Sequence, residues 1–192
     1  MRETHLVRMA QNGDETAAVT LVERHYRRIY AYLRRLSPDA ATAEDLTQET
    51  FLKAWVALPS YRHSCRFSTW LYSIAYHAFV DRHRRDARTE RRDEPWWEAL
   101  AADGDDPYST AARNGEGLAL YEAVHRLDDD KRQTIVLHYY EGLSLRETAR
   151  VLGVAPSTVK YRLSQGLALL RSGMADEPRV CSTEMHEEEE ST

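Results

Sequence analysis

Residues that typically mark the ends of helices gather near residue 153, and several polar side chains follow them. Ser144 and Glu147 have the spacing of a capping box, in which each side chain accepts the backbone N–H of the other residue. Gly153 suits the left-handed residue that ends a helix, and Pro156 suits the first position of the next helix. The outer face of that second helix keeps the polar residues Lys160, Tyr161, Ser164 and Gln165. This order predicts a helix-turn-helix that enters the major groove of duplex DNA, the alternative being an ordinary helical hairpin.

Aromatic rings alternate with cations between residues 61 and 85. The rings are Tyr61, Phe67, Trp70, Tyr72, Tyr76 and Phe79, and the cations are Arg62, Arg66, Arg82, Arg84 and Arg85. Unpaired bases stack on aromatic faces while guanidinium groups hold the phosphates, so this mixture favours single-stranded nucleic acid. The segment 62–66 follows a helix-ending proline and is predicted to be a loop that could line a pocket for a flipped-out base. The alternative is a hydrophobic core, which we expect for Leu71, Ile74 and Phe79 and which fits Trp70 equally well.

Helical periodicity predicts the elements that position these groups. Apolar residues recur at alternating spacings of four and three over 16–36, and further helices are predicted over 40–58, 67–85, 118–127 and 131–140. No stretch of any length shows the alternation of a strand. The predicted fold class is therefore all-α, with two small helical domains of which the second is the helix-turn-helix.

Charge divides the chain in the same way. The net charge is −5, yet residues 1–86 carry 13 lysines and arginines against 10 acidic residues, and residues 118–173 carry 8 against 6. The acidic excess lies in residues 87–117 and in residues 174–192, which carry one basic and seven acidic residues. Local charge, not the total, governs attraction to phosphate. We predict domains at 1–86 and 114–172, a flexible acidic linker at 87–113 and a disordered acidic tail at 173–192.

Other features exclude or disfavour several classes of protein. No run approaches the eighteen or so apolar residues that cross a bilayer, and the N-terminus lacks the apolar core of a signal peptide, so we expect a cytoplasmic protein. Cys65 and Cys181 are far apart and form no disulfide framework. His63 lies close to Cys65, but no second pair stands at ligand spacing, so no metal or other cofactor is expected. No catalytic set is recognisable, and an enzyme is the least expected class.

Three segments carry a family resemblance. They are residues 43–55 (AEDLTQETFLKAW), residues 67–75 (FSTWLYSIA) and the helix-turn-helix at 144–171. Together they resemble the group IV, or extracytoplasmic function (ECF), sigma factors of bacterial RNA polymerase, over residues 5–86 and 114–172. The resemblance implies a first domain that binds the clamp helices of the polymerase largest subunit and melts the minus-ten promoter element. It also implies a second domain that reads the minus-thirty-five element as duplex, contact with the polymerase flap, and a cognate anti-sigma factor.

The resemblance assigns site residues position by position. Those implied to bind core polymerase are Asp45, Gln48, Glu49 and Lys53. Those implied at the minus-ten element are Tyr61, Arg62, His63, Ser64, Arg66, Trp70, Ser73, His77 and Asp81. Those implied at the minus-thirty-five element are Arg146, Pro156, Thr158, Lys160, Tyr161, Ser164 and Gln165. The chain departs from the family pattern at Ala155, at His77 and at Gln165-Gly166, where we expect Gly166 to weaken its helix by about 1 kcal/mol.

Two other functions stay open at the level of sequence. A transcriptional activator of the response-regulator output type also carries a helix-turn-helix, but it would need a receiver domain with parallel strands. An adaptor or anti-sigma-like protein would bind polymerase parts without DNA. It would use the acidic face around Asp45, which suits a protein partner, but it would not need the aromatic and basic residues of the minus-ten region.

Overall fold

The computed structural model describes residues 2–37, 39–89, 120 and 122–175, and these residues form helices and the turns between them, with no strand. The prediction of an all-α fold is confirmed. The first group of helices is α1 (Glu3–Gln11), α2 (Glu15–Leu36), α3 (Ala40–Ala57), the short 3-10 turn η1 (Leu58–Ser60) and α4 (Phe67–Thr89). The second group is α7 (Asp129–Ile135), the π-helical turn η3 (Val136–Tyr140), α8 (Leu145–Leu152) and α9 (Pro156–Ala175). The predicted linker and tail lie almost entirely outside the described residues.

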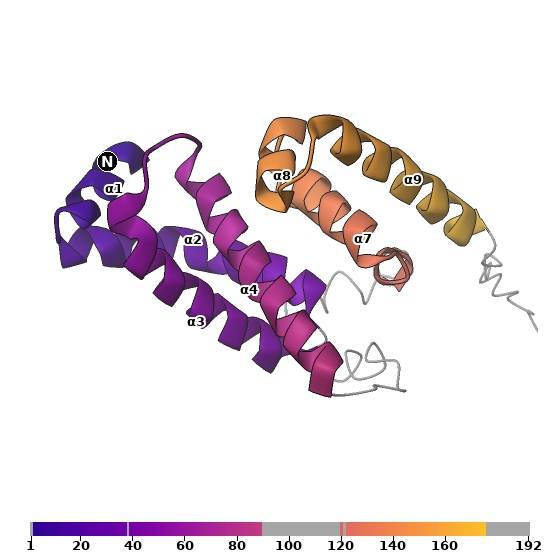
Figure 1. Ribbon diagram of the computed structural model, residues 1–192, viewed down its shortest axis with the longest axis horizontal. Helices are drawn as coiled ribbons and strands as arrows, with labels where there is room; N and C mark the ends of the chain where they lie inside the picture. The colour runs from indigo at the N-terminus through magenta and orange to yellow at the C-terminus, as the bar shows by residue number, and fades with distance from the viewer. Residues whose placement is uncertain (1, 38, 90–119, 121, 176–192) are drawn as a thin grey trace, which may run out of the picture.

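The first group is a bundle in which α2, α3 and α4 pack around an apolar core and α1 packs on α2 (Figure 1). Aspartate caps fix the starts of two of its helices: the Asp14 carboxylate accepts the Ala17 N–H at 2.9 Å, and that of Asp39 accepts the Thr42 N–H at 2.7 Å. The predicted helices began at residue 16, and the structure adds the nine-residue α1 before them, a length at which a helix depends on packing more than on propensity. Its Leu6, Val7 and Ala10 are buried.

The second group contains the helix-turn-helix that the capping and turn residues of the sequence predict. The capping box between Ser144 and Glu147 is present in both directions. Gly153 ends α8 in the left-handed conformation, with φ of 67°, and Pro156 is the first residue of α9. Gly166 has a role that the sequence did not reveal. A Cβ at this position would lie 2.7 Å from Cδ1 of the buried Ile135, so glycine lets α9 approach α7 closely.

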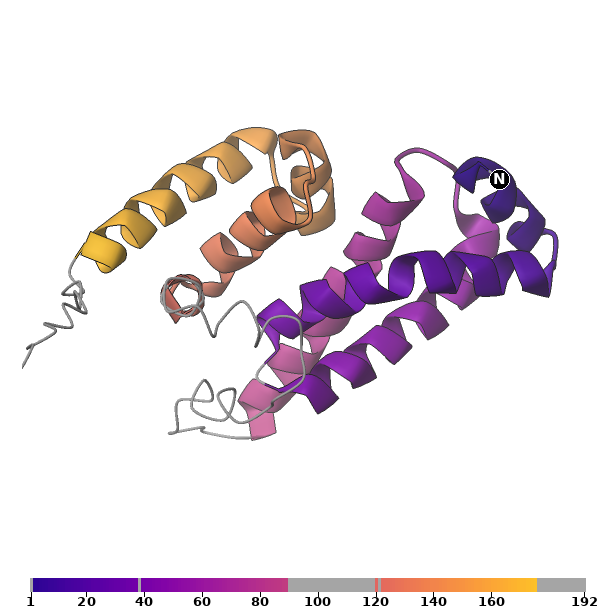
Figure 2. The ribbon, with the colours of Figure 1, turned by 180° about the vertical axis from the view of Figure 1, so that it is seen from behind.

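The two groups of helices contact each other directly. Helix α8 packs beside α4, and η3 packs on α2, so the helix-turn-helix lies against one side of the first bundle (Figures 1 and 2). None of the helices in the described part of the chain is long and apolar enough to span a membrane.

Candidate nucleic-acid interface

Helix α9 presents the polar face that was predicted for the minus-thirty-five element. Its opposite face is apolar and buried through Val159, Leu163 and Leu170. Of the residues predicted for this element on α9, Thr158 is half-buried and the others are exposed: Pro156, Lys160, Tyr161, Ser164 and Gln165. Arg146 is exposed near the start of α8. The buried face fixes the rotation of α9 about its axis, so most of the predicted minus-thirty-five residues face solvent together.

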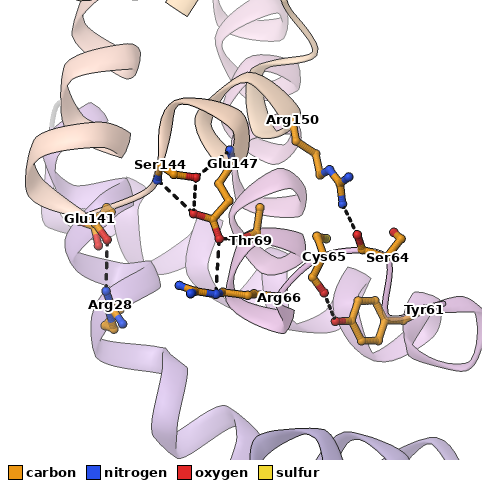
Figure 3. Close-up of polar contacts among 10 residues, drawn as sticks. All are labelled: Arg28, Tyr61, Ser64, Cys65, Arg66, Thr69, Glu141, Ser144, Glu147 and Arg150. Carbon is orange, nitrogen blue, oxygen red and sulfur yellow. Dashed lines mark hydrogen bonds and ion pairs between the residues drawn. The ribbon is translucent and has the colours of Figure 1, made fainter. Parts of the chain in front are cut away.

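The predicted minus-ten loop is a tight turn that packs against aromatic rings on its inner side. Tyr61 is buried, and its hydroxyl donates to the Cys65 carbonyl at 2.7 Å, which closes the loop on itself (Figure 3). The centroid of the Tyr61 ring lies 4.9 Å from the centroid of the Trp70 ring and 5.7 Å from that of the Phe67 ring. Burial raises the pKa of Tyr61 to about 12, so the phenol stays a hydrogen-bond donor. Tyr61 therefore supports the loop from inside, while the residues that the loop exposes are Arg62, His63, Ser64 and Arg66.

Helix α4 continues this surface with one stripe of residues. Trp70, Ser73, His77 and Asp81 recur at spacings of three and four, which places them on one helical face. Trp70 is half-buried, so both readings of its role from the sequence apply in part: one side packs on Tyr61 and Phe67, and the rest is accessible. The Ser73 hydroxyl donates to the Thr69 carbonyl within α4 at 3.0 Å, whereas His77 and Asp81 are exposed.

Helix α3 carries the residues predicted to bind polymerase. Asp45 and Gln48 are exposed, and Lys53 pairs with Glu49 at 2.7 Å. Sequence reasoning missed the apolar part of this surface: the exposed fractions are 70% for Leu52, 48% for Trp55 and 81% for Val56.

The apolar and acidic residues of α3 share one face. Residues 45, 49, 52 and 56 follow each other at helical spacings of four, three and four, and residue 48 lies three positions after residue 45, so the signal was present in the sequence. Exposed apolar side chains beside charged ones are typical of a protein-binding surface, and an acidic face would repel DNA.

Glu141 joins the two groups of helices. Its carboxylate accepts a hydrogen bond from the Tyr72 hydroxyl at 2.5 Å and pairs with Arg35 Nη1 at 2.7 Å. Its carbonyl accepts from Arg28 Nη2 at 3.2 Å (Figure 3). The Glu141 and Arg35 side chains are only 5% and 14% exposed. Burial and the Glu141 charge raise the pKa of Tyr72, so this phenol remains a donor.

A second set of contacts brings α8 onto the predicted minus-ten loop. Arg150 Nη1 donates to the Ser64 carbonyl at 2.5 Å. The Glu147 carboxylate, which also completes the capping box, lies 3.6 Å from Arg66 Nε and accepts from the Thr69 hydroxyl at 3.3 Å (Figure 3). The hydrogen bond from Ser144 is the main reason that the pKa of Glu147 is lowered. The helix-turn-helix thus engages two loop positions, Ser64 and Arg66, while its own outer face on α9 stays exposed.

Comparison with known proteins identifies the family. Residues 21–89 match the family described as Sigma-70 region 2, and residues 117–170 match that described as Sigma-70, region 4. The ECF RNA polymerase sigma factor SigW of Bacillus subtilis is 30% identical over 178 residues, which cover 88% of this chain and 95% of SigW. The chain belongs to the ECF family of sigma factors. It directs RNA polymerase to promoters, and it is not an enzyme.

Other relatives and solved structures agree. The RNA polymerase sigma-H factor of Pseudomonas aeruginosa is 31% identical, over 84% of this chain and 88% of that protein. The structure of CnrH in complex with the cytosolic domain of CnrY superimposes with a TM-score of 0.68 at 26% identity, over 90% of this chain and 97% of CnrH. The sigma factor RpoE of Bartonella quintana, solved with the anti-sigma factor NepR, has a TM-score of 0.64 at 22% identity and shows the shared fold.

Proposed function

We propose that this sigma factor reads a promoter at two places, with α9 in the major groove of the minus-thirty-five element and the 61–66 loop on the unpaired minus-ten strand. The observation that carries the second assignment is the loop itself, which exposes Arg62 and His63 beside a cluster of aromatic rings. A flipped base would stack at the accessible part of Trp70, while Arg62 and Arg66 hold the flanking phosphates.

Helix α3 is the proposed contact with core polymerase. Its stripe combines acidic side chains with Leu52, Trp55 and Val56, and tryptophan is among the residues that most often dominate protein interfaces. The partner is the clamp-helix region of the largest subunit, which would present basic and apolar groups to this stripe. The polymerase flap would meet the second group of helices. All of this takes place in the cytoplasm, where polymerase and chromosome lie.

The contact between the two groups of helices must open for this function. Arg150 and Glu147 hold Ser64 and Arg66 while α8 lies against α4, so these loop residues are not free to meet a DNA strand. We therefore assign the closed arrangement to the chain before it joins polymerase. A cognate anti-sigma factor is a further proposed partner, supported by the similarity to CnrH, which was solved with the cytosolic domain of CnrY.

Transcription from a mapped promoter tests the proposal. Start sites mapped after overexpression supply the promoter, and the protein is then added to core polymerase for run-off transcription and permanganate footprinting. Arg62→Ala should lower the reactivity of minus-ten thymines while leaving the binding of core polymerase unchanged. Arg27→Ala removes an exposed arginine on α2 and serves as the matched control. Equal thymine reactivity in both variants would remove the loop from the minus-ten site.

A further inference from the structure

One side chain outside the matched family region ties down the 61–66 loop. Gln11 ends α1, ahead of residue 21 where the family match begins. Its Nε2 donates to the carbonyl of Leu58 at 3.0 Å and to the carbonyl of Tyr61 at 2.9 Å. Its Oε1 lies 3.3 Å from Nε2 of His63. A single half-buried carboxamide thus touches the chain just before the loop, at Leu58, and within the loop at its first residue, Tyr61, and its third, His63.

The loop needs such a tie because its backbone is not held by regular structure. The Leu58 carbonyl accepts the Tyr61 N–H at 3.1 Å, and Gln11 adds a second donor to it and supplies one to the Tyr61 carbonyl just beyond η1. His63 has a φ of 55°, a left-handed conformation that costs a residue other than glycine free energy and persists only where the surroundings impose it. Among the described non-glycine residues His63 is the only one with a positive φ.

The contacts also determine how the groups are oriented. Both contacts are to carbonyl oxygens, which only accept hydrogen bonds, so the amide nitrogen of Gln11 must face Leu58 and Tyr61. The amide oxygen then faces His63, and the imidazole must carry a proton on Nε2 to donate to it. The Tyr61 ring lies 4.7 Å from the His63 ring on another side. His63 is therefore oriented by two groups, neither of which needs to contact DNA.

We propose that Gln11 is the positioning residue of the minus-ten loop, which it holds in the shape that receives an unpaired base. This proposal rests on the proposed role of the loop at the minus-ten element. Gln11 acts through the backbone at residues 58–61 and through the ring of His63. Arg62, which stands between two of the tied residues, is then presented to the DNA strand in a fixed direction.

Two variants of Gln11 test the proposal in the full chain. Gln11→Met keeps the length of the side chain and removes both donors, and Gln11→Glu keeps the shape but turns an oxygen toward two carbonyls. Asn12→Ala removes a neighbouring exposed carboxamide and serves as the matched control. The first measurement, hydrogen exchange of residues 59–66 without DNA or polymerase, should be about tenfold faster in both Gln11 variants and unchanged in the control.

The second measurement is made on the holoenzyme. Affinity for a single-stranded minus-ten oligonucleotide should fall about tenfold in the Gln11 variants, while affinity for core polymerase and for duplex minus-thirty-five DNA stays within twofold. A Gln11 variant with normal loop exchange overturns the proposal. So does one with fast exchange but normal oligonucleotide affinity, provided that Arg62→Ala lowers that affinity. If Arg62→Ala has no effect either, the proposed function of the loop fails, and the exchange result shows separately whether Gln11 shapes it.

Discussion

Removing the Glu141 carboxylate should release the helix-turn-helix from the first group of helices. In the closed arrangement this carboxylate is the acceptor for Arg35 and for the Tyr72 hydroxyl, and the Glu141 side chain is 5% exposed. Glu141→Ala removes this acceptor and leaves the Arg35 guanidinium and the Tyr72 phenol at the interface between the two groups of helices. In the open arrangement water solvates both groups, so the substitution penalises only the closed arrangement.

The size of the effect follows from the burial of the pair. Breaking a buried ion pair by removing one partner typically costs about 3–5 kcal/mol, because the remaining charge is uncompensated. Arg35 keeps a contact with the Ala31 carbonyl at 3.3 Å and is 14% exposed, so we expect the lower end, about 3 kcal/mol. That corresponds to roughly a hundredfold shift of the equilibrium toward the open arrangement.

Small-angle X-ray scattering and hydrogen exchange measure this shift without labels. Glu141→Ala should increase the radius of gyration and speed exchange in the loop at 61–66, which loses its cover by α8. Glu122→Ala is the matched control, because Glu122 pairs with Arg126 at the protein surface ahead of α7, with the two charged groups 3.5 Å apart. Arg35→Ala should open the chain as well, and the double variant Arg35→Ala with Glu141→Ala should open it less than the two effects added together.

The proposed role of Glu141 is refuted if Glu141→Ala and Glu122→Ala give the same scattering profile and the same exchange rates. It also fails if the effects of Arg35→Ala and Glu141→Ala are strictly additive, since additivity means that the two side chains are not energetically coupled.

Three further outcomes are expected. Trp70→Ala should lower permanganate reactivity at the minus-ten element about tenfold or more, because stacking of one base is worth roughly 1–3 kcal/mol. The affinity of the holoenzyme for duplex promoter DNA should stay unchanged. Lys160→Ala should weaken holoenzyme binding to all promoter duplexes and reduce the slope of log affinity against log salt concentration by about one. Gln165→Ala should instead change which base pair is tolerated at one position of the promoter. Competition assays over a range of salt concentrations measure both effects. Burial lowers the pKa of His125 in the folded chain to about 3, whereas the ordinary value of 6.5 applies in the unfolded chain. As the pH falls below 6.5, the unfolded chain therefore binds a proton that the folded chain does not, which favours unfolding. Stability to urea should therefore drop by about 2 kcal/mol between pH 7 and pH 5, and by clearly less in His125→Leu.

Features encoded by neighbouring residues could be predicted from the sequence. The capping box, the left-handed Gly153 and Pro156 at the start of α9 each depend on residues within a few positions of each other, and all three are present. The same holds for the outward polar face of α9, because one helical period relates Lys160 and Ser164 to the buried side. Local rules therefore fixed both the type of motif and its exposed face.

At Gly166 the sequence indicated one effect of the glycine and missed another. Glycine weakens a helix interior, and from the sequence this was its only expected effect. The structure shows that the position faces Ile135 from α7, so a methyl group would have to displace a buried side chain. Glycine therefore weakens α9 but allows α9 to pack closely against α7. The first effect can be expected from the sequence of α9 alone, whereas the second depends on where Ile135 lies in the fold.

Contacts between distant residues were beyond any local rule. Glu141 and Arg35 are 106 positions apart, and Gln11 is 50 positions from Tyr61. In the sequence Glu141 follows a pair of tyrosines, and Gln11 ends a short amphipathic segment, so each has the appearance of an ordinary surface residue. Their importance arises because folding removes water from their partners: a buried guanidinium or a carbonyl at a helix end then requires one particular acceptor or donor. The same physical rule explains both residues, and it becomes applicable only once the helices are in place.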